Sequence, residues 1–232
     1  MNDWAKRIKD NLISFYDELT GVLEDCGRQK NDLNVLFATK YLNSDQLSTF
    51  IDLYNNIWGK KMFIGENKLQ DAEKKFAFLR VKNPQYYRLI KRIMIGNLQK
   101  NKINKSLEIF EEIWGVDSFE VVDALNKRVI KNRLPIFLEI NISGERSKRG
   151  IMETQADEII GEIVKMDNLK LKGVMTMAPQ TIDRTHIREI FRALKRIAVR
   201  HKILASMGMS SDWQEAVAEG SDFLRIGSLV FK

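Results

Sequence analysis

The sequence has few of the residues that form disulfides, interrupt helices or bind metals: one cysteine, three prolines and two histidines among 232 residues. Because a disulfide needs two cysteines, Cys26 has no partner within the chain, and we expect a reducing cytoplasm as its compartment. His186 and His201 fall in a predicted helix and a loop, so we interpret both as surface residues. Without a Cys/His cluster or an H-E-x-x-H motif, we expect no metal site.

The chain also has no long apolar segment. No run approaches the roughly 20 consecutive apolar residues of a membrane-spanning helix. Lys6, Arg7 and Lys9 interrupt the N-terminal segment, which argues against a signal peptide. We therefore expect no membrane association.

Charge does not single out a nucleic-acid-binding protein. The formal net charge is +7, which could serve an RNA-binding surface. A solvated basic surface that attracts anionic ligands explains it as well. No block of basic residues alternates with aromatic residues, so we do not favour nucleic acid as a partner.

The hydrophobic periodicity predicts one long helix followed by eight strand–helix units. The leading helix spans 3–24. The predicted strands are 33–38, 62–64, 89–95, 113–116, 136–140, 171–175, 203–205 and 223–226. The predicted helices between them are 45–57, 67–79, 101–111, 119–131, 154–165, 183–199 and 212–219.

This alternation predicts a parallel α/β sheet, and eight units in about 200 residues are typical of a closed (β/α)₈ TIM barrel. The alternative is an open doubly wound sheet, which usually carries a G-x-G-x-x-G segment after its first strand. That segment is absent here. We therefore expect residues 1–232 to form one TIM-barrel domain with an extra N-terminal helix.

Three predicted strand ends carry the chemistry of a phosphate-containing cofactor. Lys40 closes the first strand, Ser206-Met-Gly-Met-Ser210 follows the seventh, and Arg225-Ile-Gly-Ser228 spans the end of the eighth. Turns that combine glycine and hydroxyl residues bind phosphate through backbone N–H groups. The first, seventh and eighth strands become neighbours when a barrel closes. A lysine that can form a Schiff base beside two such turns suggests pyridoxal 5′-phosphate (PLP).

Individual roles follow from residue type. Gly208 and Gly227 would let the backbone approach an anion. Arg225 near the pyridine nitrogen would keep that nitrogen unprotonated, or it could simply pair with a buried carboxylate. Met207 and Met209 could pad the cofactor ring or belong to the core.

Two further expectations concern the surroundings of these groups. Phe37 and Tyr41 could shield Lys40 from water. Ser210 or Ser211 could cap the helix that starts near Asp212.

The ordered set of motifs closely resembles the pyridoxal-phosphate homeostasis protein family, which includes the YggS and PROSC proteins. The resemblance runs from about Leu33 to Phe231. The motifs that carry it are Ala-Thr-Lys40, Ile64-Gly-Glu-Asn67, Ile95-Gly-Asn-Leu-Gln-Lys-Asn-Lys102, Val116-Asp-Ser118, Glu139-Ile-Asn-Ile-Ser143, Ser147-Lys-Arg-Gly150, Gly173-Val-Met175, Ser206-Met-Gly-Met-Ser210 and Arg225-Ile-Gly227.

The resemblance implies a barrel similar to the N-terminal domain of alanine racemase, with a Schiff base on Lys40 and Asn67 beside the cofactor. It also implies phosphate contacts from Ser206, Gly227 and Ser228. The full set of expected cofactor-binding residues is Lys40, Asn67, Ser206, Met207, Gly208, Arg225, Gly227 and Ser228. One departure stands out: the family usually has a Trp-His pair where this chain has Arg92 and Ile93.

Three functions remain to be compared. The first is a non-catalytic, monomeric PLP-binding protein of vitamin B6 homeostasis, with PLP-dependent apoenzymes as candidate recipients. The second is a PLP-dependent racemase or decarboxylase of the same barrel type; those enzymes resemble this chain but add a β-rich domain with a catalytic tyrosine. We expect the first function, because the chain ends at the barrel and shows no second base. The third, RNA binding, would need a clustered basic face.

Overall fold

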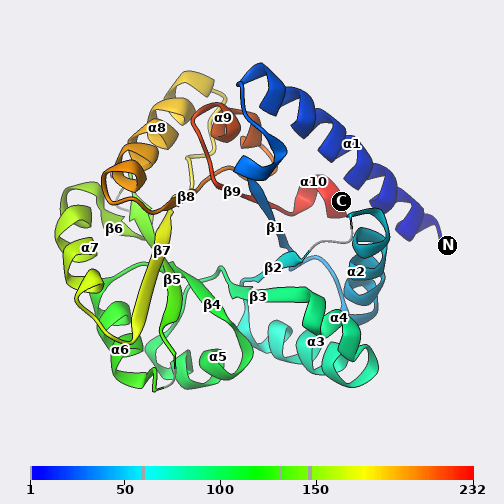
Figure 1. Cartoon of the computed structure of the whole chain (residues 1–232), viewed down its shortest axis with the longest axis horizontal. Helices are drawn as coiled ribbons and strands as arrows, with labels where there is room; N and C mark the ends of the chain where they lie inside the picture. The colour runs from blue at the N-terminus through cyan, green and yellow to red at the C-terminus, as the bar shows by residue number, and fades with distance from the viewer. Residues whose placement is uncertain (1, 59–60, 131, 146–147) are drawn as a thin grey trace.

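Eight parallel strands close into a barrel, as predicted (Figure 1). The computed structural model describes residues 2–58, 61–130, 132–145 and 148–232. The strand order is β4-β3-β2-β1-β9-β8-β7-β5, and pairing of β4 with β5 completes the circle. The barrel strands are β1 (Asn34–Ala38), β2 (Met62–Glu66), β3 (Ile90–Met94), β4 (Glu112–Val116), β5 (Leu134–Asn141), β7 (Leu169–Met175), β8 (Leu204–Ser206) and β9 (Phe223–Ile226).

Helices cover the outside of this barrel. They are α2 (Ser44–Trp58), α3 (Leu69–Lys82), α5 (Ile103–Ile109), α6 (Phe119–Arg128), α7 (Ala156–Val164), α8 (Arg184–Arg200), α9 (Trp213–Ala218) and α10 (Ser228–Phe231). Sequence periodicity predicted all of these except α10. It also missed α4 (Pro84–Leu89) and the two-residue strand β6 (Ile151–Met152), which extends the sheet beside β5. These three elements are too short to show a hydrophobic period.

The extra N-terminal helix α1 (Asp3–Asp25) covers the seam where β1 pairs with β9. It packs against α2, α9 and α10, which lie around that seam in Figure 1. Its buried face repeats every three or four residues and consists of Ala5, Ile8, Leu12, Phe15, Leu19 and Leu23. The amide of Asn11 donates to the carbonyl of Val230 at 3.0 Å. Because α10 has only four residues, α1 supplies the cover that a full eighth barrel helix would give.

The barrel interior is a packed core and not a channel. Alternate residues point inward and form a cluster of Leu36, Ile93, Trp114, Phe137, Met175 and Phe223. The rings of Trp114 and Phe137 stack with centroids 4.1 Å apart. Below them, the buried carboxylate of Glu112 accepts hydrogen bonds from Trp114 and Lys172, both at 2.9 Å. Side chains thus fill the barrel interior at the N-terminal ends of the strands.

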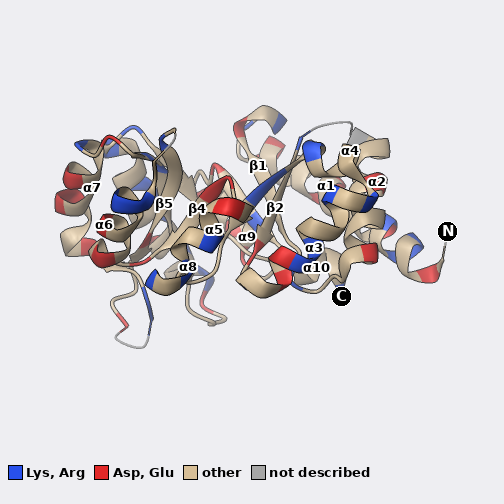
Figure 2. Cartoon of the chain, turned by 90° about the horizontal axis from the view of Figure 1, so that it is seen from below, with Lys and Arg blue, Asp and Glu red and all other residues tan. Residues whose placement is uncertain are grey.

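Figure 2 shows Lys and Arg interspersed with Asp and Glu over the helices. Many of the basic groups on α8 are paired: Arg188 and Arg192 both contact Glu219, and Lys195 contacts Asp222. None of the helices in the described part of the chain combines the length and apolar character needed to cross a membrane.

Candidate cofactor site

The candidate residues from β1 and β9 are direct neighbours at the C-terminal end of the barrel. The register pairs Leu36 with Arg225 and Phe37 with Ile226. A Cβ atom built on Gly227 would lie 3.3 Å from the Ala38 carbonyl oxygen and 3.2 Å from Cε2 of Tyr41. The turn after β9 therefore presses against the segment that carries Lys40, as the barrel topology predicted.

Lys40 is exposed and directly follows the buried Thr39. Its Nζ lies 5.2 Å from the centroid of the Tyr41 ring, and Nζ of Lys232 lies 5.0 Å from the same ring. The electron-rich face of a tyrosine ring attracts ammonium groups at such distances. Tyr41 thus contacts Lys40 but does not shield it from water, because Lys40 is exposed. Phe37 does not shield Lys40: it is buried in the outer core, 5.1 Å from Phe50 between ring centroids. The pleat sends its side chain outward, towards α2.

Arg225 is a fixed, buried cation at the end of the barrel. Its Nη1 donates to the carbonyl oxygen and to Oγ of Ser206, each at 2.8 Å, and its Nη2 donates to the Thr176 carbonyl oxygen at 2.7 Å. Burial lowers the pKa of Arg225, while the carboxylates of Glu139 and Asp212 act in the opposite direction. The hydroxyl of Ser206 is thus engaged in a hydrogen bond inside the protein.

Glu139, at the end of β5, is a buried acidic residue near the candidate site. It belongs to one of the family motifs, but the sequence analysis did not predict a role for it. It is 7% exposed, and its carboxylate forms no hydrogen bond with any other described residue. Burial raises the pKa of Glu139; the charge of Arg225 opposes this shift, and that of Asp117 adds to it. The sequence did contain one indication of a functional role, because Glu139 is an acidic residue near the end of a predicted buried strand.

Ser210 joins the two turns that were expected to hold phosphate. Its Oγ accepts hydrogen bonds from the amides of Gly227 at 3.2 Å and Leu229 at 3.1 Å. The expectation that Ser210 or Ser211 caps α9 is wrong, because Asp212 is the N-cap and neither hydroxyl bonds to that helix. Instead, Oδ1 of Asp212 accepts from the amide of Met209 at 2.6 Å.

Met207 and Gly208 have structural roles in this turn. Met207 is fully buried in the outer core, which matches the core alternative for this residue. Gly208 has a φ of +91°, and a Cβ there would collide with the side chains of Ala216 and Leu224. Close packing against α9 therefore requires glycine at this position.

A buried ion pair supports the segment that ends in Lys40. Glu66 and Thr39 are fully buried, and Oε1 of Glu66 accepts from Thr39 Oγ1 at 2.6 Å and from Lys75 Nζ at 2.7 Å. Lys75 also donates to the Thr39 carbonyl at 2.8 Å. Burial raises the pKa of Glu66, and Lys75 and Thr39 oppose the shift. The sequence analysis did not predict this ion pair. The sequence shows only an acidic residue at a strand end, followed by lysines in the next helix.

The remaining motifs surround this end of the barrel. Asn67 follows β2, and its backbone lies so close to Gly96 that a side chain on Gly96 would overlap it. Ile93, at the position of the family's histidine, is fully buried in the interior cluster, and Arg92 lies over the Tyr87 ring at 4.1 Å. Ser147 of the Ser147-Lys-Arg-Gly150 motif lies outside the described residues.

The histidines lie on the outer surface. Nε2 of His201 is 2.7 Å from Oδ1 of Asp157, and Nδ1 of His186 is 3.8 Å from Glu189. Within the described ranges, no group of three or more His, Cys, Asp or Glu side chains is arranged to hold a metal ion.

Comparison with known proteins identifies the family. The model of the alanine racemase N-terminal domain matches residues 75–232. A pyridoxal phosphate homeostasis protein from Helicobacter pylori is 34% identical over 174 residues, which cover 72% of this chain and 76% of that protein. The chain belongs to the pyridoxal phosphate homeostasis proteins of the alanine racemase N-terminal-domain family.

Other relatives extend the match over the full barrel. A pyridoxal phosphate homeostasis protein from Aquifex aeolicus is 28% identical over 96% of both chains. A crystal structure of an unknown protein from Bifidobacterium adolescentis has a TM-score of 0.87 and 28% identity, covering 100% of this chain and 97% of the other.

Two more solved structures share the fold. PipY from Synechococcus elongatus, solved with PLP bound, has a TM-score of 0.79 and 21% identity, covering 97% of this chain and all of PipY. An alanine racemase from Clostridium difficile has a TM-score of 0.71 and 11% identity; 97% of this chain matches 59% of that enzyme.

Proposed function

We propose that this protein binds PLP at the C-terminal end of its barrel and holds it for cellular vitamin B6 homeostasis. The observation that carries the proposal is the contact between the Gly227 turn and the end of β1, which brings the backbone N–H groups of that turn next to the segment that carries the exposed Lys40. PLP, when bound, supplies a phosphate, a pyridine ring and an aldehyde that a lysine amine can hold as a Schiff base.

The turn after β9 fits a phosphate group. The amides of Gly227 and Leu229 converge on one oxygen atom, Oγ of Ser210, so the backbone already directs two N–H groups at a single acceptor. The amide of Ser228, between them, donates no hydrogen bond to any other described residue. Backbone amides arranged in this way bind anionic oxygens well. Ser206 would contribute less directly, because its hydroxyl already donates to the Phe223 carbonyl oxygen at 3.3 Å and accepts from Arg225.

Lys40 fits the role of the amine that holds the aldehyde. It is exposed, follows a strand anchored by the Glu66–Lys75 pair, and lies next to the Gly227 turn. Tyr41 offers its ring face to the ammonium group of Lys40 and so positions it at the end of the barrel. Asn67 would lie across the site, at the end of β2.

Arg225 would stand beside the pyridine nitrogen. Three acceptors fix its guanidinium group, and two carboxylates support its charge. A permanent cation there keeps the pyridine nitrogen unprotonated and weakens the ring as an electron sink. The residues therefore favour storage and delivery of the cofactor over turnover.

The alternative is a PLP-dependent racemase or decarboxylase, and Glu139 is the feature that favours it. A racemase needs a base on each side of its substrate, and Lys40 could be only one of them. Glu139 is a buried carboxyl group with a raised pKa at the same end of the barrel. We do not propose this activity, because Arg225 beside the pyridine nitrogen would weaken the ring as an electron sink, which a racemase tolerates only with two well-placed bases.

Several properties of the protein belong to the same proposal. We expect residues 1–232 to act as one cofactor-binding unit, monomeric and cytoplasmic. PLP-dependent apoenzymes are the proposed recipients of the cofactor.

Spectroscopic titration tests the proposed site. Adding PLP to the protein should produce the absorbance band of a lysine Schiff base. Lys40→Arg should abolish the band, whereas Lys232→Arg, which removes the other amine on the Tyr41 ring, should retain it. A band that persists in Lys40→Arg would move the site to another lysine.

A further inference from the structure

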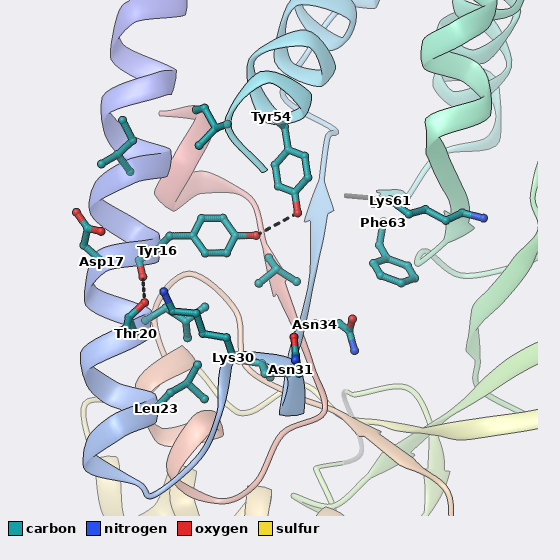
Figure 3. A pocket seen from close by; sticks show the side chains of 15 residues that line it. Tyr16, Asp17, Thr20, Leu23, Lys30, Asn31, Asn34, Tyr54, Lys61 and Phe63 are labelled. Atoms are coloured by element: carbon teal, nitrogen blue, oxygen red, sulfur yellow. Dashed lines mark hydrogen bonds between the residues drawn. The ribbon is translucent and has the colours of Figure 1, made fainter. Parts of the chain in front are cut away.

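A cavity lies at the opposite end of β1 from Lys40 (Figure 3). Its volume is about 410 Å³, within the range of small-molecule pockets. It is enclosed by α1, by the short helix η1 (Lys30–Asp32), by the beginnings of β1 and β2, and by the end of α2. Nothing in the cofactor site uses these residues.

Two phenols form the polar end of this cavity. The hydroxyls of Tyr16 on α1 and Tyr54 on α2 are 3.5 Å apart, and Figure 3 shows the rings extending towards each other from the two helices. Burial raises the pKa of both tyrosines. Both groups therefore stay protonated at physiological pH and form a polar part of the cavity wall.

One ammonium group brings a positive charge to the cavity. Lys30 extends from η1 towards α1 in Figure 3, across the lower part of the cavity. It forms no ion pair within the described part of the chain. Lys61 also lines the cavity, but its ammonium group points away from the two phenols. Asp17 also lines the cavity, but its carboxylate is exposed on the outer side of α1.

Apolar side chains form much of the remaining cavity wall. Leu23, Leu33 and Val35 are buried there, and Phe63 adds an aromatic ring. Such a wall can pack against a flat aromatic ring, while the ammonium group of Lys30 can form an ion pair with an acidic group.

We propose that this cavity binds a compact aromatic acid, with the ring between α1 and β1 and the acidic group at Lys30. The proposal does not depend on PLP binding at the other end of the barrel. It rests on the joint presence of a cavity, an apolar wall and a cation without an ionic partner among the described residues.

Two dyes of similar shape test the proposal in the full-length protein. 8-Anilinonaphthalene-1-sulfonate carries an acidic group, and N-phenyl-1-naphthylamine is its uncharged counterpart. Fluorescence titration should show one site per chain for the charged dye. Lys30→Glu should weaken binding of the charged dye by about tenfold, since an ionic attraction becomes a repulsion. Lys61→Glu is the matched control and should change the affinity by less than about twofold.

A second pair of variants tests the location without changing charge. Ile13 and Ile57 line the cavity and are partly exposed, so tryptophan at either position should fill the cavity without disturbing the core. Ile13→Trp and Ile57→Trp should each weaken the binding of both dyes. Circular dichroism checks that the variants are folded. No binding to the wild type, unchanged binding in both tryptophan variants, or equal losses in Lys30→Glu and Lys61→Glu would each overturn the proposal.

Discussion

The ammonium group of Lys75 lies 2.8 Å from the main-chain carbonyl oxygen of Thr39, the residue before Lys40. The same ammonium group is 2.7 Å from the carboxylate of Glu66, which is fully buried. A helix side chain thus fixes the backbone at the end of β1 and neutralises a buried charge. The position of the proposed cofactor lysine depends on this contact.

Removing Lys75 should therefore affect both stability and cofactor binding. Lys75→Met leaves Glu66 buried without its counter-ion, which costs about 3–5 kcal/mol of unfolding free energy. Glu66→Gln combined with Lys75→Met removes both charges and should recover part of that loss. Urea unfolding measures stability. PLP titration under folded conditions should show weaker binding in Lys75→Met; unchanged binding would mean that Lys75 does not position Lys40.

A side chain at Gly227 should reduce PLP affinity more than it reduces stability. The new Cβ would lie 3.2 Å from Tyr41 and 3.3 Å from the Ala38 carbonyl, and the branches of valine would extend over the proposed phosphate site. Gly227→Val should weaken PLP binding by more than about tenfold, equivalent to about 1.4 kcal/mol. The control is Gly161→Val on α7, where nothing lies within 4 Å of an added Cβ. Equal affinity in wild type and Gly227→Val would place the phosphate elsewhere.

The contact between Gly227 and the end of β1 was predictable from the sequence, because eight alternating units close into a barrel in which the first and last strands pair. The predicted last strand, 223–226, coincides with β9. The Glu66–Lys75 pair was not predictable, since periodicity does not show which charges on a helix turn inward. The bonds of Ser210 and the burial of Met207 depend on how the turns fold back, which local sequence does not determine.

Glu139 should make stability depend on pH. Its pKa in the folded protein is raised above the ordinary value of 4.5, so between these two values the folded state binds more protons than the unfolded state. Stability therefore falls as pH rises through this window, by about 1.4 kcal/mol for each unit of the shift. Urea unfolding of wild type and Glu139→Gln from pH 4 to pH 8 compares the two slopes, and we expect the glutamine variant to lose less stability. Parallel curves would show that Glu139 is not responsible.

Racemisation should be negligible. With Arg225 beside it, the pyridine nitrogen of bound PLP would stay unprotonated, so the ring would do little to stabilise the charge left when a bound amino acid loses a proton. Incubating L-alanine with saturating protein and PLP, followed by chiral chromatography, should yield no sustained formation of D-alanine. Turnover of about 1 s⁻¹ or faster, the low end of ordinary enzymes, would contradict the storage function. If such turnover were observed and the Glu139→Gln variant lacked it, Glu139 would be identified as the second base.

The attachment site of PLP tests the central claim most directly. Borohydride reduction of the protein–PLP complex fixes the cofactor on its lysine, and mass spectrometry of the peptides then identifies that lysine. We predict one labelled residue, Lys40, which lies at the end of β1 beside the Gly227 turn. Label found mainly on Lys100, Lys102 or Lys148 would contradict the proposed site.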